Sequence, residues 1–139
     1  MNREKAVRHL FILWLVAACF ATLCVCLQIL GGRYGGDGQI ALNWLLGQYT
    51  PVLSILLAAA FSEPSKKWRE HPVNQWKFRW SVAISAFQIF LMISFIIFQP
   101  ALNALGITAY SLFESTQAIL LVLQSVAVAA IGSVIFDGR

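Results

Sequence analysis

The sequence predicts an all-α polytopic membrane protein, a four-transmembrane-helix bundle in one domain, residues 1–139. Four long apolar runs predict it, at residues 10–30, 40–61, 80–98 and 114–136, whose only charged side chain is Glu114. Each run is about long enough to cross a hydrocarbon core of roughly 30 Å as a helix. The chain is also 59% hydrophobic and 12% charged, with a mean hydropathy of +0.73. These values lie outside the range of soluble domains.

The distribution of basic residues predicts the orientation. With both termini in the cytoplasm, the cytoplasmic side carries nine of the ten Lys and Arg residues, and only Arg33 lies outside. The positive-inside rule therefore favours an N-in, C-in protein, and the short loops favour a bacterial inner (plasma) membrane. The same rule interprets the net charge of +4 as a topology signal, so we expect the lipid bilayer and no nucleic acid as a partner.

The first apolar run, residues 10–30, follows a basic leader and begins like a signal peptide. Ala17, Ala18 and Cys19 even resemble a lipoprotein cleavage site. Because the apolar run continues to Leu30, we expect an uncleaved first span. The three cysteines all lie in this run, which favours small packing residues over a disulfide framework.

A glycine-rich connection and a proline characterise the next part of the chain. Residues 31–39 contain five glycines and predict a short outer loop, without the strand, helix and lysine of a phosphate-binding loop. Pro51 then falls inside the second run and leaves the backbone carbonyl near Gly47 without its helical donor. A nearby side chain or a neighbouring helix must supply a partner. Pro51 is thus either a packing kink or a hinge.

Residues 62–79 form the predicted cytoplasmic loop, SEPSKKWREHPVNQWKFR, which its prolines divide into short pieces. Its interleaved cations and aromatic rings suit a lipid headgroup layer or a cytosolic protein partner, and both interpretations stay open. The candidate contact residues are Lys66, Lys67, Trp68, Arg69, Trp76, Lys77 and Arg79.

Polar side chains inside the spans predict contacts between helices. Ser81, Ser85, Gln88 and Met92 recur on one face of the third span, which we expect to point at protein rather than lipid. Residues 99–110 are expected to form an outer connection, with Ser111 and Glu114 as a capping box for the fourth helix. The candidates for helix association or for lining a pore are Gln48, Ser85, Gln88, Gln117, Gln124 and Ser125.

Catalytic chemistry is not expected. Apart from Glu114 at its edge, the membrane region has no ionisable Asp, Glu, Lys or Arg, where such groups are costly and mark function when present. His9 and His71 lie outside the spans without a second ligand at metal-binding spacing. The sequence therefore predicts a non-enzyme without a metal or cofactor.

The layout resembles the small four-span membrane subunits of bacterial antiphage systems, such as phage-exclusion proteins or the membrane component of Kiwa-type defence. The resemblance consists of a short basic N-terminus, a glycine-containing outer loop and the inner loop SKKWREHPVNQWKFR. It covers the whole chain and includes no diagnostic motif, so it is an analogy of layout. Small multidrug exporters differ by a glutamate in their first helix, and disulfide-forming oxidases by paired outer-loop cysteines.

Two functional hypotheses follow, and a third, an immunity or inhibitor protein that acts on another membrane protein, stays open. The first is a non-catalytic, homo-oligomeric sensor or scaffold whose basic inner loop holds a cytosolic protein at the membrane. The second is a small channel or pore-forming effector, with Pro51 as its hinge and the Gln and Ser faces of the third and fourth spans as its lining.

Overall fold

In the computed structural model, residues 1–61 and 66–136 are described, Lys66 and Lys67 by their backbone alone. The predictions for residues 62–65 and for Arg139 lie outside these ranges. The described residues form helices and no strand beyond one isolated bridge between Asn2 and Pro72. The helices are α1 (Arg3–Leu30), α2 (Gly38–Phe61), α3 (Lys66–Glu70), α4 (Gln75–Ala104) and α5 (Ala109–Ile135). All but α3 are long and apolar enough to cross a membrane, as predicted.

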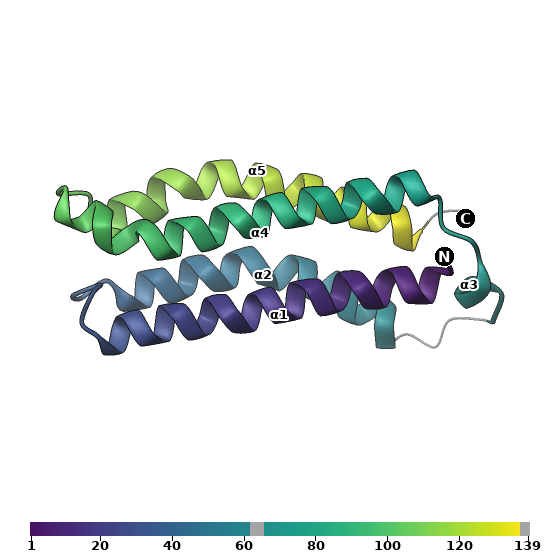
Figure 1. Ribbon diagram of the computed structural model, residues 1–139, viewed down its shortest axis with the longest axis horizontal. Helices are drawn as coiled ribbons and strands as arrows, with labels where there is room; N and C mark the ends of the chain where they lie inside the picture. The colour runs from purple at the N-terminus through teal and green to yellow at the C-terminus, as the bar shows by residue number, and fades with distance from the viewer. Residues whose placement is uncertain (62–65, 137–139) are drawn as a thin grey trace.

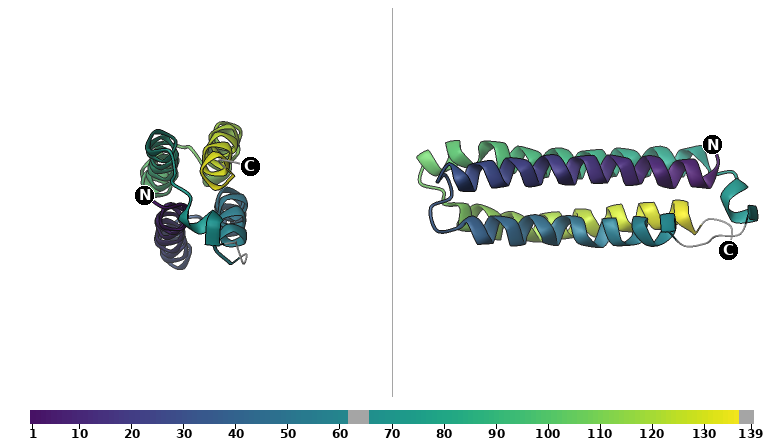
Figure 2. Two further views of the ribbon diagram at one scale, coloured as in Figure 1. Left: turned by 90° about the vertical axis from the view of Figure 1, so that its right-hand side faces the viewer. Right: turned by 90° about the horizontal axis from the view of Figure 1, so that it is seen from below.

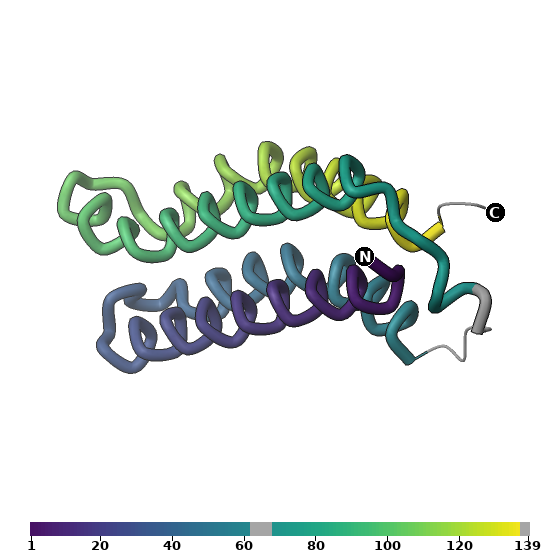
Figure 3. The backbone as a smooth tube through the Cα atoms, turned by 45° about the vertical axis from the view of Figure 1, so that its right-hand side comes forward, coloured from purple at the N-terminus to yellow at the C-terminus, as the bar shows by residue number. Residues whose placement is uncertain are grey.

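The four long helices stand at the corners of a square (Figures 1 and 2). Two hairpins, α1–α2 and α4–α5, lie side by side, and α2 also packs against α5 and α1 against α4 (Figure 3). Helices α2 and α4 occupy opposite corners, so the segment that carries α3 crosses the end of the bundle (Figure 2). We call this the basic end, made of residues 1–9 and 66–79, and the other the glycine end, made of residues 31–44 and 105–117.

The helices extend beyond the apolar runs, and one predicted connection is much shorter than expected. Helix α4 continues through Pro100 to Ala104, so residues 105–108 alone connect it to α5. The prediction of an outer connection over residues 99–110 was therefore wrong. Proline was taken to end the helix, but a side chain from α1 replaces the missing hydrogen bond, as described below.

The predicted capping box of α5 was also wrong. The helix begins at Ala109, and its N-cap is Thr108, whose side-chain oxygen accepts a hydrogen bond from the backbone N–H of Ser111 at 3.3 Å. The Ser111 hydroxyl in turn donates to the Thr108 carbonyl at 3.0 Å. Glu114 therefore lies inside the helix and accepts no capping bond.

The glycine-rich connection is short, as predicted, but it ends at residue 37 rather than 39 because α2 begins at Gly38. Residues 31–37 are turns, and Gly32 and Gly35 have positive φ angles of 68° and 55°, which residues with a Cβ rarely adopt. The turns bring Tyr34 back onto the bundle, where its ring lies 6.0 Å from that of Phe113. The loop is thereby attached to α5.

The interior contrasts with the outer surface. Trp14, Leu56 and Leu120 are among the largest fully buried side chains, and the Trp14 and Tyr49 rings meet edge to face at 5.8 Å. Large apolar side chains such as Leu23, Phe90 and Val122 point outward along the helices. An exposed apolar belt of this kind is expected where helices face hydrocarbon.

Candidate functional site

Gln124 of α5 hydrogen-bonds to the backbone of α2 next to Pro51. Because proline has no N–H, the carbonyl of Gly47, four residues earlier, lacks its helical donor. The Gln124 side chain fills this position: its Nε2 donates to the Gly47 carbonyl at 3.1 Å and to the Gln48 carbonyl at 2.8 Å. The partner that the sequence required is thus supplied by a neighbouring helix, while Thr50 bonds Leu46 of its own helix.

Pro100 and Gln28 repeat this arrangement between α4 and α1. The carbonyl that Pro100 deprives of a donor is that of Ile96. The Nε2 of Gln28 donates to this oxygen at 3.0 Å. Both prolines within the long helices are therefore matched by a glutamine from another helix, which ties the hairpins to each other. Sequence inspection missed the second pair because Pro100 was assigned to a loop.

Three glutamines lie at one level in the middle of the bundle, and we call Gln48, Gln88 and Gln124 the glutamine layer. Gln124 bonds the backbone at Gln48. The bond from Ser81 to the Ala130 carbonyl sets the register of antiparallel α4 and α5, which places Gln88 at about the level of Gln124. Each of the three is at most 4% exposed. The predicted polar face of α4 thus points into the protein.

Several polar atoms in and beside this layer have no hydrogen-bond partner within the described part of the chain. They are Oε1 of Gln48, both amide atoms of Gln88 and Oγ of Ser85. An unsatisfied buried amide costs about 1–3 kcal/mol. A group of such atoms, which includes both donors and acceptors, offers hydrogen bonds to a water molecule or another polar guest.

The remaining association candidates lie elsewhere. Gln117 and Ser125 are exposed on α5, and the Ser125 hydroxyl bonds the Leu121 carbonyl of its own helix. The structure therefore does not bring them together with the glutamine layer. Because the layer is buried within one chain, it presents no surface to a second copy.

The basic end is a structured surface. The N-terminus pairs with the segment after α3: the Arg3 N–H donates to the His71 carbonyl at 3.1 Å, and the Val73 N–H donates to the Met1 carbonyl at 3.1 Å. The Arg3 guanidinium also lies 5.2 Å from the centre of the Trp68 ring, within the range of a cation–π contact. These contacts fix α3 on the start of α1.

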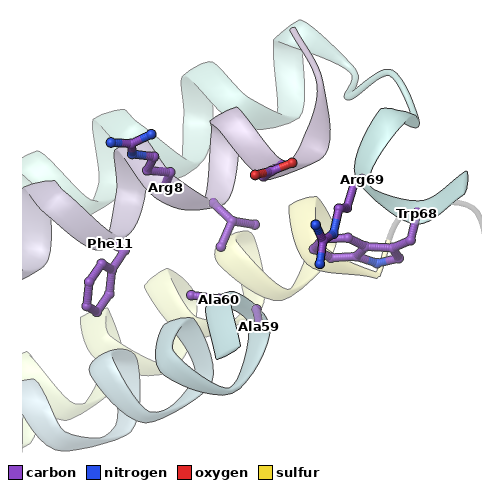
Figure 4. Close-up of a pocket in the computed structure, with 8 residues that line it drawn as sticks. Arg8, Phe11, Ala59, Ala60, Trp68 and Arg69 are labelled. Atoms are coloured by element: carbon purple, nitrogen blue, oxygen red, sulfur yellow. The ribbon is translucent and has the colours of Figure 1, made fainter. Parts of the chain in front are cut away.

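A pocket of about 260 Å³ opens at this end between α1, α2 and α3 (Figure 4). Val7, Phe11, Ala59 and Ala60 supply apolar surface, and Glu4, Arg8, Trp68 and Arg69 supply charged and aromatic groups. Arg8 and Arg69 are both exposed. With the Glu4 carboxylate, the two guanidinium groups leave this lining with one net positive charge beside an apolar surface, which suits an anionic group that carries apolar neighbours.

The structure brings only part of the predicted basic set to this pocket. Trp68 and Arg69 line it, whereas Trp76, Lys77 and Arg79 belong to the first turns of α4. Trp76 stacks edge to face on Trp80 at 5.3 Å. Arg8 was missed as a site residue because it was counted only as a topology signal, and Glu4 because it precedes the first span.

Comparisons with known protein families, with curated protein sequences and with solved structures find no match to this chain. Among the described residues, no three His, Cys, Asp or Glu side chains are grouped so that they could hold a metal ion.

Proposed function

We propose that this protein is a non-catalytic subunit of a bacterial inner membrane that holds a cytosolic protein at the membrane through its basic end. The observation that carries the proposal is the fixed position of α3. The Arg3–Trp68 contact joins it to α1, and two backbone hydrogen bonds join the segment after it to the N-terminus. A surface that is ordered before binding loses less entropy when a partner docks. The two arginines of the pocket suit an acidic segment of that partner.

The proposed orientation has both termini and the basic end in the cytoplasm. Its support is the positive-inside rule, since only Arg33 of the Lys and Arg residues belongs to the glycine end. Single cysteines in place of Arg33 and of Lys5, in a background without the native cysteines, test it. In intact cells, a membrane-impermeant maleimide should label position 33 and leave position 5 unlabelled. The reverse pattern refutes the orientation.

Co-purification in mild detergent tests the partner. The wild-type protein should recover one cytosolic protein in stoichiometric amount, and the double variant Arg8→Ala, Arg69→Ala should lose it. Arg33→Ala is the control, because it removes an arginine from the opposite end. Equal recovery with all three proteins, or no stoichiometric partner with any, contradicts the proposal. The layout analogy suggests phage-infected cells as the first source of the partner.

Homo-oligomer formation is a further part of the proposal. The glutamine layer is buried, so copies would meet through lipid-facing surfaces such as the groove between α1 and α2. The lining of this groove is mostly apolar and includes the small side chains of Cys19, Thr22 and Thr50. Small side chains allow close contact between helices. The mass of the protein–detergent complex decides the point: a monomer at all concentrations excludes the oligomer.

The alternative function is a pore, which the unpartnered atoms of Gln48, Ser85 and Gln88 favour. These side chains are packed in the bundle, so a continuous path would require the helices to separate. Reconstituted protein should then pass ions or a small dye across liposomes, and Gln88→Leu should change the flux. Vesicles that stay tight under all conditions contradict the pore.

A further inference from the structure

A second pocket lies at the glycine end, far from the surface proposed to bind the cytosolic partner. It has a volume of about 290 Å³ and is formed between the first turns of α2 and α5. Its walls include Asn43, Trp44, Tyr110, Phe113, Glu114 and Gln117. None of these residues except Gln117 was expected to form a site.

The aromatic part of the wall is held rigidly. The Trp44 and Phe113 rings lie 4.7 Å apart with an angle of 35° between their planes. Phe113 is 1% exposed and Trp44 6% exposed, and the Tyr34 ring supports Phe113 from the glycine loop. Because these rings are fixed by packing, the pocket exists before any ligand enters.

Among the described residues, the wall of the pocket carries one charged side chain, Glu114. Its carboxylate accepts a hydrogen bond from the Tyr110 hydroxyl at 3.4 Å, which is too long to be strong. No Lys, Arg or His side chain of residues 1–61 and 68–136 forms an ion pair with it. Asn43 and Gln117 add exposed amide groups.

We propose that this pocket binds a small organic cation, an alkylammonium group, with Glu114 as its counter-ion, the half-exposed Tyr110 ring beside it and the buried Trp44 and Phe113 rings as its floor. Aromatic rings attract ammonium groups through their negative faces, and a carboxylate next to them supplies the opposite charge. The volume is at the lower limit for a ligand pocket, which restricts the ligand to a small molecule or a headgroup. Both a free amine and the ammonium headgroup of a zwitterionic phospholipid have this chemistry.

Ligand-observed NMR titration of the purified full-length protein with choline and with ethanolamine tests the proposal. We expect saturable binding in lipid-free detergent, and at least about a tenfold loss of affinity in Glu114→Gln. Tyr110→Leu should weaken binding about threefold or more, because it removes an aromatic ring from the pocket. Tyr110 is half-exposed, so this change leaves the core intact. Asp37→Asn is the control, since it removes an acidic charge from the same end outside the pocket and should leave the affinity unchanged.

The two sources of the cation are separated by the surrounding lipid. If the natural ligand is a headgroup, choline binding should disappear in nanodiscs of phosphatidylethanolamine and persist in nanodiscs of phosphatidylglycerol. If the natural ligand is a free amine, choline should bind equally in both. Absence of saturable binding in detergent overturns the proposal, as does an equal effect of Asp37→Asn and Glu114→Gln. The co-purification experiment concerns the opposite end, so its result is independent of this one.

Discussion

Replacing Gln124 with leucine should destabilise the bundle through the backbone of another helix. The side chain donates to the Gly47 and Gln48 carbonyls at 3.1 and 2.8 Å, and an interhelical hydrogen bond in a membrane contributes about 0.6 kcal/mol. The Gly47 carbonyl has no helical donor because of Pro51, so the variant also leaves a part-buried acceptor inside a long apolar helix unpaired, at about 1–3 kcal/mol. We expect a loss of about 2–3 kcal/mol.

A double-mutant cycle with Pro51→Ala isolates this contribution. Alanine restores an N–H that can donate to the Gly47 carbonyl, so in the Pro51→Ala background Gln124→Leu should cost only about 1 kcal/mol. Stability is measured as reversible unfolding by SDS in mixed micelles, followed by far-UV circular dichroism. Ser125→Ala is the control, because Ser125 is exposed and bonds its own helix; its effect should stay within about 0.5 kcal/mol. Equal costs of Gln124→Leu in both backgrounds would refute the reasoning.

Three further predictions use the same unfolding assay. Gln28→Leu should lower the free energy of unfolding by about 1–2 kcal/mol, because it removes one hydrogen bond to the Ile96 carbonyl. The loss should be smaller in a Pro100→Ala background, where a backbone N–H can replace that bond, and equal losses in both backgrounds contradict the pairing. Gln88→Met, which conserves volume and removes two unpartnered atoms, should raise stability by about 1–3 kcal/mol, whereas a loss of stability would show that the amide has a partner such as water. Burial raises the pKa of Tyr34 to about 12, so the protein should lose stability between about pH 10 and 12, where the unfolded phenol ionises and the folded one does not. Tyr34→Phe should reduce that loss, and an unchanged pH profile would assign it to another group.

The four long helices could be predicted from composition, and the burial of the polar residues of α4 could be predicted from their spacing. The burial of Ser81, Ser85, Gln88 and Met92 follows from their position on one helical face. The sequence predicts that the Gly47 carbonyl requires a hydrogen-bond donor from elsewhere, because proline always removes an N–H. It does not predict that Gln124 is this donor, because nothing local specifies which helix lies beside α2.

The end of α4 shows the limit of local reasoning. Pro100, Asn103 and Gly106 are loop-forming residues by propensity, yet the helix continues to Ala104. The reason is Gln28, whose amide donates to the carbonyl of Ile96, 68 positions further along the chain. A tertiary contact thus overrides a local preference.

The sequence by itself determined that the chain has four apolar helices and that its basic residues are segregated. These properties follow from hydrophobic length and charge, which each segment carries independently of its neighbours. Only the tertiary structure decided that α2 and α4 occupy opposite corners and that α3 lies against the start of α1. It also decided that Trp44 and Glu114 share a pocket. These depend on which helix faces pack together, and packing is a property of pairs of segments far apart in the chain.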